Sequence, residues 1–272
     1  MTEEMLEWSG LFDSHAHYFD SRFEGQADAL LSERVLAEGV AGIINVATNP
    51  KNAVACIEQA AKYPQMYCAV GIHPEDCQND VEDKEEALAA IRALLDTEEK
   101  RRKNKIVALG EIGLDYHWEP VQKERQAAFF EAQMEMAREL GLPVIIHDRE
   151  AHGDCFETVL KYPEVTGVFH SFSGSAELAR ELTRRGWYVS FSGVLTFKNA
   201  RKVREVAASV PRDRILIETD APYLAPEPFR GRLNHSGLMS YTARTLAEIL
   251  GISYEETVVL TAENAKKLFG IL

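Results

Sequence analysis

Two histidines stand one residue apart near the start of the chain, His15 and His17, directly after a short apolar run. In an extended strand, residues i and i+2 project from the same face. Two imidazoles on one face can hold one metal ion together, and neutral imidazole suits Zn, Mn, Fe or Ni. Taken alone the pair is a modest signal, because surface and core histidines reach this spacing by chance.

Four further metal-competent side chains each close an apolar, strand-like run later in the chain: Glu111, His147, His170 and Asp220. A buried histidine bonded to a carbonyl, or an aspartate capping a helix, explains any one of them but not all together. The combined set exceeds the three protein ligands of a typical mononuclear catalytic zinc site. It therefore predicts two divalent metal ions, about 3.5–4 Å apart as in many phosphoesterases.

The two carboxylates have distinct expected roles. Glu111 is predicted to bridge the two metals, because a carboxylate offers two oxygens. Asp220 is predicted to ligate one metal and to accept a proton from the attacking water. Metals in such a site lower the pKa of that water, so no activated side-chain nucleophile is needed. The pattern indicates a metallohydrolase.

Eight short β-rich runs must position these residues, and longer amphipathic segments separate them. This alternation favours parallel strands with crossover helices. Eight strands in about 250 residues are typical of a (β/α)8 TIM-type barrel, an α/β fold whose active site lies at the C-terminal ends of the strands. The predicted strands are Gly10–Asp13, Gly42–Ala47, Met66–Gly71, Ile106–Gly110, Leu142–Ile146, Gly167–Phe169, Tyr188–Phe191 and Ile215–Glu218, and the clearest predicted helices are Gln122–Leu140, Ser240–Leu250 and Tyr254–Phe269.

A doubly wound open sheet is the rival fold. Its usual Gly-x-Gly-x-x-Gly fingerprint after the first strand is absent here, and His15-Ala16-His17 stands in that place. No linker-like tract or internal repeat interrupts the chain. We therefore expect a single domain spanning residues 1–272.

Composition narrows the setting. No stretch approaches the roughly 18 apolar residues that span a bilayer, and residues 1–7 are acidic where a secretory leader would be basic. The four cysteines are irregularly spaced, so we expect reduced thiols and a cytoplasmic location. A net charge of −13 argues against a wide nucleic-acid-binding surface. Much of the acid lies in residues 80–99, read as a solvated helix, whereas basic residues gather between 198 and 214.

Six sequence motifs resemble those of the TatD family of metal-dependent deoxyribonucleases, in the amidohydrolase-like group of barrel metalloenzymes. The motifs occur in the family's order and cover most of the chain: Phe12–His17, Val70–Pro74, Gly110–Tyr116, Val144–Ala151, Phe169–Gly174 and Ile217–Leu224. The resemblance implies a TIM-type barrel with two divalent metals, Mg, Mn or Zn. It places His15, His17, Glu111, His147, His170 and Asp220 at the ligand positions.

The resemblance also implies the reaction, which is hydrolysis of DNA phosphodiester bonds, with 3′-to-5′ exonuclease action on single strands as the expected form. DNA degradation and repair are the expected setting, with no obligate protein partner. Side chains beside the ligands are candidates for holding substrate: His73, Arg149, Ser171, Ser173 and Arg230. For His73 and Arg149, a purely structural role is about equally expected, Arg149 then pairing with a neighbouring glutamate.

The chain departs from the family pattern after Asp220. Asn234 is kept, but His235 and Ser236 replace an acidic-Pro pair, so substrate binding is expected to differ from that of the family. Ser171 stands where cysteine is common. Two other readings stay open: an ester or amide metallohydrolase, for example an aminoacyl-tRNA deacylase, and a metal-holding barrel that acts only through partners. Steep salt dependence favours the nuclease, because binding through several phosphates releases counterions.

Overall fold

The computed structural model describes residues 10–271, which form two compact units. The first unit contains residues 10–44 and 174–271, and the second contains residues 45–173. Residues 1–7, on which the expectation about a leader rests, lie outside the described part. No helix within residues 10–271 is long and apolar enough to cross a membrane.

Eight strands form the sheet, and their order in it follows the chain from β1 to β8. Apart from the C-terminal half of β5, each is almost entirely buried, and each is followed by at least one helix, as expected for parallel strands covered on both faces. This is the pattern of a (β/α)8 fold, and the predicted fold class is confirmed. The strands are β1 Leu11–Ala16, β2 Val40–Val46, β3 Met66–Val70, β4 Ile106–Asp115, β5 Val144–Arg149, β6 Gly167–Phe169, β7 Tyr188–Phe191 and β8 Ile215–Ile217.

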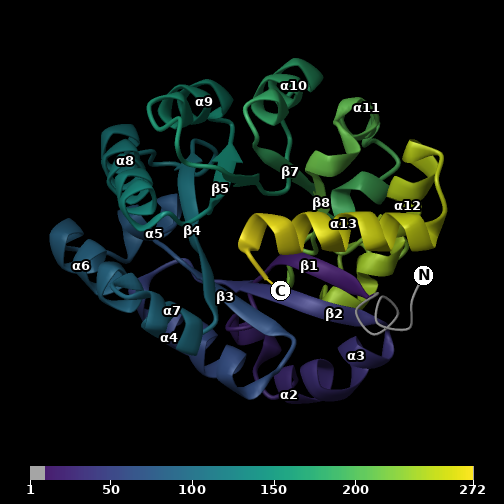
Figure 1. Ribbon diagram of the computed structural model, residues 1–272, viewed down its shortest axis with the longest axis horizontal. Helices are drawn as coiled ribbons and strands as arrows, with labels where there is room; N and C mark the ends of the chain where they lie inside the picture. The colour runs from purple at the N-terminus through teal and green to yellow at the C-terminus, as the bar shows by residue number, and fades with distance from the viewer. Residues whose placement is uncertain (1–9, 272) are drawn as a thin grey trace. The chain divides into compact units, whose positions relative to one another are not determined.

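In the first unit, the C-terminal helix α13, Tyr254–Phe269, packs on β1 and β8 (Figure 1). Its start is fixed by a capping box in which Ser253 and Glu256 each bond the other's backbone N–H. It ends at Gly270, whose φ of 64° suits a residue without Cβ. The unit's other helices are α2 Ala27–Ala29, α3 Val35–Ala37, α10 Ala176–Arg184, α11 Arg201–Ser209 and α12 Met239–Leu250.

In the second unit, the long helix α8, Lys123–Leu140, lies against β4 (Figure 1). Phe130, Met134 and Ala137 are buried at the helical spacing expected from sequence, so this prediction is confirmed. Gly141, with a φ of 63°, ends the helix. The unit's other helices are α4 Pro50–Lys62, α5 Pro74–Asn79, α6 Lys84–Leu95, α7 Glu98–Lys103 and α9 His152–Leu160.

Two strands of the second unit extend beyond their predicted ends. β4 runs on to Asp115 and β5 to Arg149, because Ile112–Asp115 pair with Ile146–Arg149 in parallel register. The strands approach closely here: a Cβ on Gly113 would lie 2.0 Å from the carbonyl oxygen of His147. Glu111 and His147 therefore lie within β4 and β5. From the sequence they were predicted to lie just after these strands, so those two predicted strand ends are wrong.

The acidic segment is less solvated than predicted. Helix α6 buries Ala87, Leu88, Ile91 and Leu95 on one face, so its carboxylates occupy only the opposite face. The charged segment that follows forms the short helix α7, which buries no residue.

Candidate metal centre

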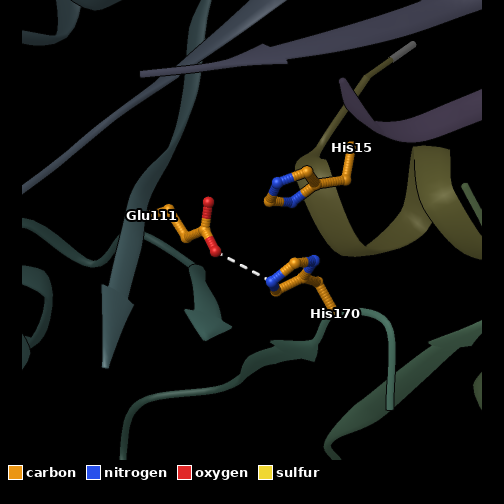
Figure 2. Close-up of side chains that lie close together, drawn as sticks. All are labelled: His15, Glu111 and His170. Carbon is orange, nitrogen blue, oxygen red and sulfur yellow. Dashed lines mark ion pairs between the residues drawn. The ribbon is translucent and has the colours of Figure 1, made fainter. Parts of the chain in front are cut away.

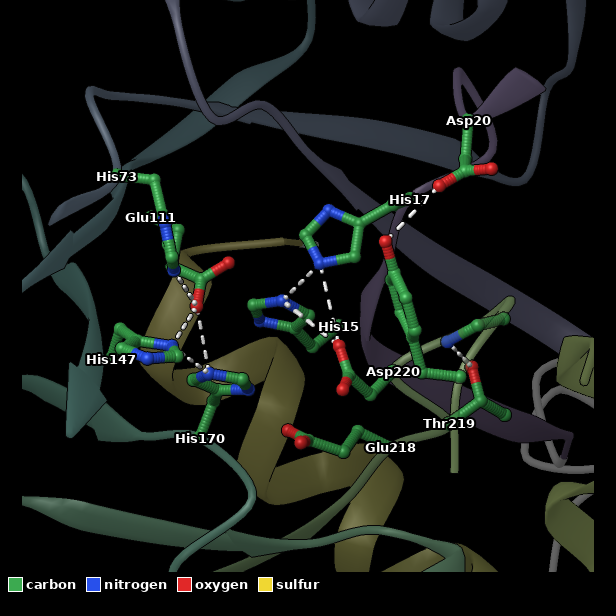
Figure 3. A network of polar contacts seen from close by, with 12 residues as sticks. His15, His17, Asp20, His73, Glu111, His147, His170, Glu218, Thr219 and Asp220 are labelled. Carbon is green, nitrogen blue, oxygen red and sulfur yellow. Dashed lines mark hydrogen bonds and ion pairs between the residues drawn. The ribbon is translucent and has the colours of Figure 1, made fainter. Parts of the chain in front are cut away.

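The first unit brings His15, His17 and Asp220 together, and we call this set the β1/β8 cluster. The two Nε2 atoms of the histidines lie 3.0 Å apart (Figure 3). The Oδ1 atom of Asp220 lies 3.3 Å from Nε2 of His17 and 3.8 Å from Nε2 of His15. His15 and His17 are buried, and the Asp220 side chain is 15% exposed.

The backbone around Asp220 is held in a shape that aims its carboxylate at the histidines. Asp220 has a φ of 56°, in the left-handed region that aspartate tolerates better than most residues. Its N–H donates to the carbonyl of His15, and its own carbonyl accepts from the N–H of Tyr223. Ala16 forms an isolated parallel bridge with Ala221. These bonds tie the end of β1 to the loop after β8.

A buried carboxylate, Asp13, ties the same two segments together. It accepts bonds from the backbone N–H and the hydroxyl of Thr219, at 2.9 and 2.6 Å, and from the N–H of His15 at 3.3 Å. Burial raises the pKa of Asp13 to about 6, although the bonds from Thr219 work against this shift. Asp13 therefore positions residues on either side of the β1/β8 cluster.

Residues 234–236, where the sequence departs from the family pattern, also support this cluster. Asn234 donates to the carbonyls of Thr219 and Tyr223, which flank Asp220. The Ser236 hydroxyl bonds the Tyr18 hydroxyl at 2.8 Å, and the N–H of Ser236 donates to the same oxygen. Because Tyr18 directly follows His17, Ser236 fastens the chain just after β1, the strand that carries His15.

The second unit brings Glu111, His147 and His170 together, and we call this set the β4–β6 cluster. The Oε1 atom of Glu111 lies 2.8 Å from Nε2 of His170 (Figure 2) and 2.7 Å from Nδ1 of His147. The two histidine nitrogens are 3.2 Å apart. Backbone bonds from Glu111 to Ala47 and from His170 to Ile146 hold the strand ends that carry them.

The other nitrogen of His147 bonds to Asp115, a residue that the sequence did not single out. Nε2 of His147 lies 2.9 Å from Oδ2 of Asp115. Burial lowers the pKa of His147, but the bonds to Asp115 and Glu111 outweigh this and raise the pKa to about 9. An imidazole whose second nitrogen donates to a carboxylate is the arrangement that orients a metal ligand.

His73 lies beside the β4–β6 cluster, but its tautomer makes it a donor. Its Nδ1 accepts a bond of 3.1 Å from the N–H of Glu75 at the start of α5. A neutral imidazole carries its one proton on the other nitrogen, so Nε2 is an N–H group. That Nε2 lies 3.5 Å from Oε1 of Glu111 (Figure 3). His73 therefore suits donation to an anionic oxygen better than ligation of a metal.

The donor atoms of each cluster fit a divalent cation. Metal–nitrogen and metal–oxygen bonds of about 2.0–2.2 Å place tetrahedral ligand atoms about 3.3–3.6 Å from one another. The converging atoms of the β1/β8 cluster span 3.0–3.8 Å, and those of the β4–β6 cluster span 2.7–3.2 Å. Slight expansion of the second set would accommodate an ion. Imidazole and carboxylate donors suit Zn and Mn.

The remaining predicted substrate residues lie in different surroundings. The Arg149 guanidinium stands over the indole of Trp118, 5.1 Å from the ring centroid. Arg230 stands over Phe197 at 4.4 Å. Ser171 and Ser173 lie on the loop after His170, where Ser171 is half-buried and Ser173 is exposed. Among the described residues, no hydrogen bond or ion pair links Arg230 to the β1/β8 cluster.

Asp13 and Asp115 are the buried carboxylates beside the candidate ligands that sequence reasoning missed. One signal was present for each: Asp13 lies two residues before His15, and Asp115 lies four after Glu111, so each shares a strand face with a predicted ligand. Asp115 closes none of the predicted apolar runs, and Asp13, which ends the first predicted strand, was passed over for the two histidines that follow it.

Comparison with known proteins identifies the family. The family described as TatD related DNase matches residues 12–270. YabD of Bacillus subtilis (strain 168), an uncharacterized metal-dependent hydrolase, is 41% identical over 264 residues, which cover 96% of this chain and 99% of YabD. YcfH of Escherichia coli (strain K12), also an uncharacterized metal-dependent hydrolase, is 36% identical over 267 residues, 96% of each chain.

A solved structure agrees in fold. The crystal structure of YjjV, a TatD homologue from Escherichia coli K12, superposes with a TM-score of 0.88 at 30% identity, covering 96% of this chain and 98% of YjjV. These matches extend over nearly the whole chain, including both histidine clusters and the motifs around them. The chain therefore belongs to the TatD-related DNase family of metal-dependent hydrolases.

Proposed function

We propose that this protein hydrolyses phosphodiester bonds of DNA, as a 3′-to-5′ exodeoxyribonuclease on single strands. Two divalent cations are required in this proposal, one held by the β1/β8 cluster and one by the β4–β6 cluster. The observation that carries the proposal is the convergence of imidazole and carboxylate donors, His15, His17 and Asp220 in one cluster and Glu111, His147 and His170 in the other, in a chain of the TatD-related DNase family.

The bound cations would offset charge developing on the phosphate oxygens and lower the pKa of the attacking water. Asp220 is the proposed acceptor of the proton from that water, because its carboxylate is 15% exposed while the histidines beside it are buried. Short contacts of Glu111 with two histidines support its role as a ligand. The bridging role of Glu111 stays a prediction, which counting bound metal in Glu111→Ala tests.

Two side chains near the β4–β6 cluster are proposed to hold the substrate phosphate. The N–H at Nε2 of His73 can donate to a phosphate oxygen or to the leaving 3′-oxygen. Arg149 lies two residues beyond His147 on the same strand face and presents a planar guanidinium suited to two phosphate oxygens. The histidine-rich donor sets favour Zn or Mn at least as much as Mg, which prefers oxygen ligands.

The test is cleavage of 5′-labelled single-stranded DNA by metal-stripped protein reloaded separately with Mg, Mn and Zn. We expect products that shorten one nucleotide at a time from the 3′ end. In Glu111→Ala we expect cleavage to fall below detection while circular dichroism shows an unchanged fold. Intact DNA with every metal, despite bound metal, would reject the nuclease and direct the assay to ester and amide substrates, aminoacyl-tRNA among them.

A further inference from the structure

Trp118 is an apolar side chain that the fold leaves open to solvent. It follows β4 by three residues, and 53% of its surface is exposed. It is the most open of the exposed large apolar side chains in residues 10–271, followed by Val54 at 50%. Its ring is nevertheless fixed on two sides: His117 stands perpendicular to it, with centroids 4.7 Å apart, and Arg149 covers part of a face at 5.1 Å.

The segment that carries Trp118 is anchored to the β4–β6 cluster. The N–H of His117 donates to Oδ1 of Asp115 at 2.8 Å, and the other oxygen of Asp115 bonds His147. Arg149 is the parallel register partner of Asp115, and its carbonyl accepts from the N–H of Tyr116. Trp118 and Arg149 are thus held at the same strand ends as the proposed ligand His147.

Within residues 10–271 no carboxylate lies at ion-pair distance from the Arg149 guanidinium, and Glu75 interacts with it only at longer range. Arg149 is exposed, and no ion pair within 4.0 Å joins it to any other residue in that described range. The predicted pairing with a neighbouring glutamate is not seen, since Glu150 pairs with His117 at 2.6 Å. An exposed cation beside an exposed indole presents one group for a phosphate and one for an aromatic ring.

We propose that Trp118 and Arg149 form a nucleotide subsite for single-stranded DNA, in which a base stacks on the open indole and the neighbouring phosphate pairs with the guanidinium. The subsite rests on the proposed nuclease function and names the part of the substrate that it reads. Stacking accepts every base, because each has a π-face, so the subsite selects unpaired DNA without selecting sequence. In a duplex the base faces are already stacked and unavailable.

The test measures binding and therefore does not depend on cleavage. Metal-loaded protein is titrated with fluorescent single-stranded oligonucleotides made resistant to hydrolysis by phosphorothioate linkages, either complete or lacking bases. Wild-type protein should prefer the complete strand. In Trp118→Ala, this preference should fall by about 5- to 150-fold, the effect of losing one base–aromatic stack, while Trp118→Phe should keep most of it.

Affinity falls as salt concentration rises, and Arg149→Gln should make the slope of log affinity against log salt concentration shallower by about 0.7. This is the effect of one lost phosphate contact on a single strand. Matched controls are Tyr241→Ala, an exposed aromatic of the first unit, and Arg102→Gln, an exposed arginine on α7. Both should leave the preference and the salt slope unchanged.

The outcomes separate the subsite from the nuclease. If the protein cleaves DNA but Trp118→Ala keeps the wild-type preference for bases, the subsite is wrong and the nuclease stands. If Trp118→Ala loses the preference in a protein that cleaves no DNA with any metal, the subsite stands and the nuclease is wrong. If wild-type protein binds complete and base-free strands equally, the subsite is rejected.

Discussion

At the scale of single residues, the contact that most shapes the β4–β6 cluster is the one between Asp115 and His147. His147 uses both ring nitrogens, one toward Glu111 and one toward Asp115. Burial raises the pKa of Asp115, but the bond to His147 more than reverses this, so the pKa lies below its usual value. Asp115 therefore stays ionised at neutral pH and fixes both the ring orientation and the proton on Nε2.

Asp115→Asn should weaken metal binding at this cluster about 10- to 100-fold, which is the usual effect of losing a carboxylate that orients a ligating histidine. The substitution keeps the side-chain size and removes the charge that holds the Nε2 proton. Isothermal titration with Zn or Mn measures the change. Asp80→Asn, at an exposed position after α5, is the control. Equal affinities in wild type and Asp115→Asn would show that Asp115 does not orient a ligand.

The six candidate ligands were accessible from sequence because each closes an apolar run, and strand ends in such a fold converge by topology. Asp13 and Asp115 were not accessible in the same way. Their roles depend on partners that only the register supplies, Thr219 for Asp13 and His147 for Asp115. The tautomer of His73 likewise depends on one backbone N–H at the start of α5.

At the scale of elements, the apolar middle of each strand could be predicted from the sequence, but the ends of several strands could not. The apolar runs of β6 and β7 gave their bounds correctly. In β4, however, Glu111 and Asp115 interrupt the apolar pattern while the backbone continues to pair with β5. The functional residues lie where the strand pattern breaks, so the same polar side chains that mark the site obscure the strand end.

The stability of the junction between β5 and α9 depends on pH through the ionisation of His152. Its Nδ1 bonds Oδ2 of the largely buried Asp148 at 2.7 Å. This bond raises the pKa of His152 above 6.5, and partial burial only reduces the shift. A histidine whose pKa is raised by folding binds protons more tightly in the folded state. The contribution of His152 to the free energy of unfolding is therefore complete below its pKa in the unfolded state. It is lost as the pH rises through its pKa in the folded state.

We expect His152→Gln to lower the free energy of unfolding by about 0.2–1 kcal/mol at acidic pH, a small value because the side chain is 37% exposed. At a pH above the folded-state pKa of His152 the difference should vanish, since His152 is then neutral in both states. Urea unfolding at the two pH values measures it. An Asp148→Asn background is the control, in which the pH-dependent difference should disappear. A loss of equal size at both pH values would contradict the ionic origin.

At the scale of the whole chain, the negative net charge opposes the proposed binding of DNA. A net charge of −13 repels a polyanion, yet the groups proposed to meet DNA are local: two metal ions, Arg149 and His73. Screening limits the reach of the remote carboxylates to about 8–10 Å at physiological salt. Composition alone therefore could not decide between a nuclease and a hydrolase of small substrates, and the arrangement of a few residues carries the argument.

Metal binding should also stabilise the fold, because the donors of each cluster come from segments far apart in the chain, such as β1 and the loop after β8. An unfolded chain does not hold these donors together, so the metal binds the folded state preferentially. At a free metal concentration 100 times the Kd, one site adds about 2.7 kcal/mol to the free energy of unfolding. For a chain of this size, that corresponds to a rise of roughly 5–10 °C in Tm.

Thermal unfolding of metal-stripped protein, with and without added Mn or Zn, tests this expectation. Glu111→Ala should show a smaller rise than wild type at equal metal concentration, because the β4–β6 cluster has lost its carboxylate. His117→Gln, which removes a histidine outside both clusters, should rise as wild type does. An equal rise in all three proteins would mean that metal stabilises the chain at some other place. Separate losses in Glu111→Ala and Asp220→Ala, each partial, would instead assign one stabilising ion to each cluster.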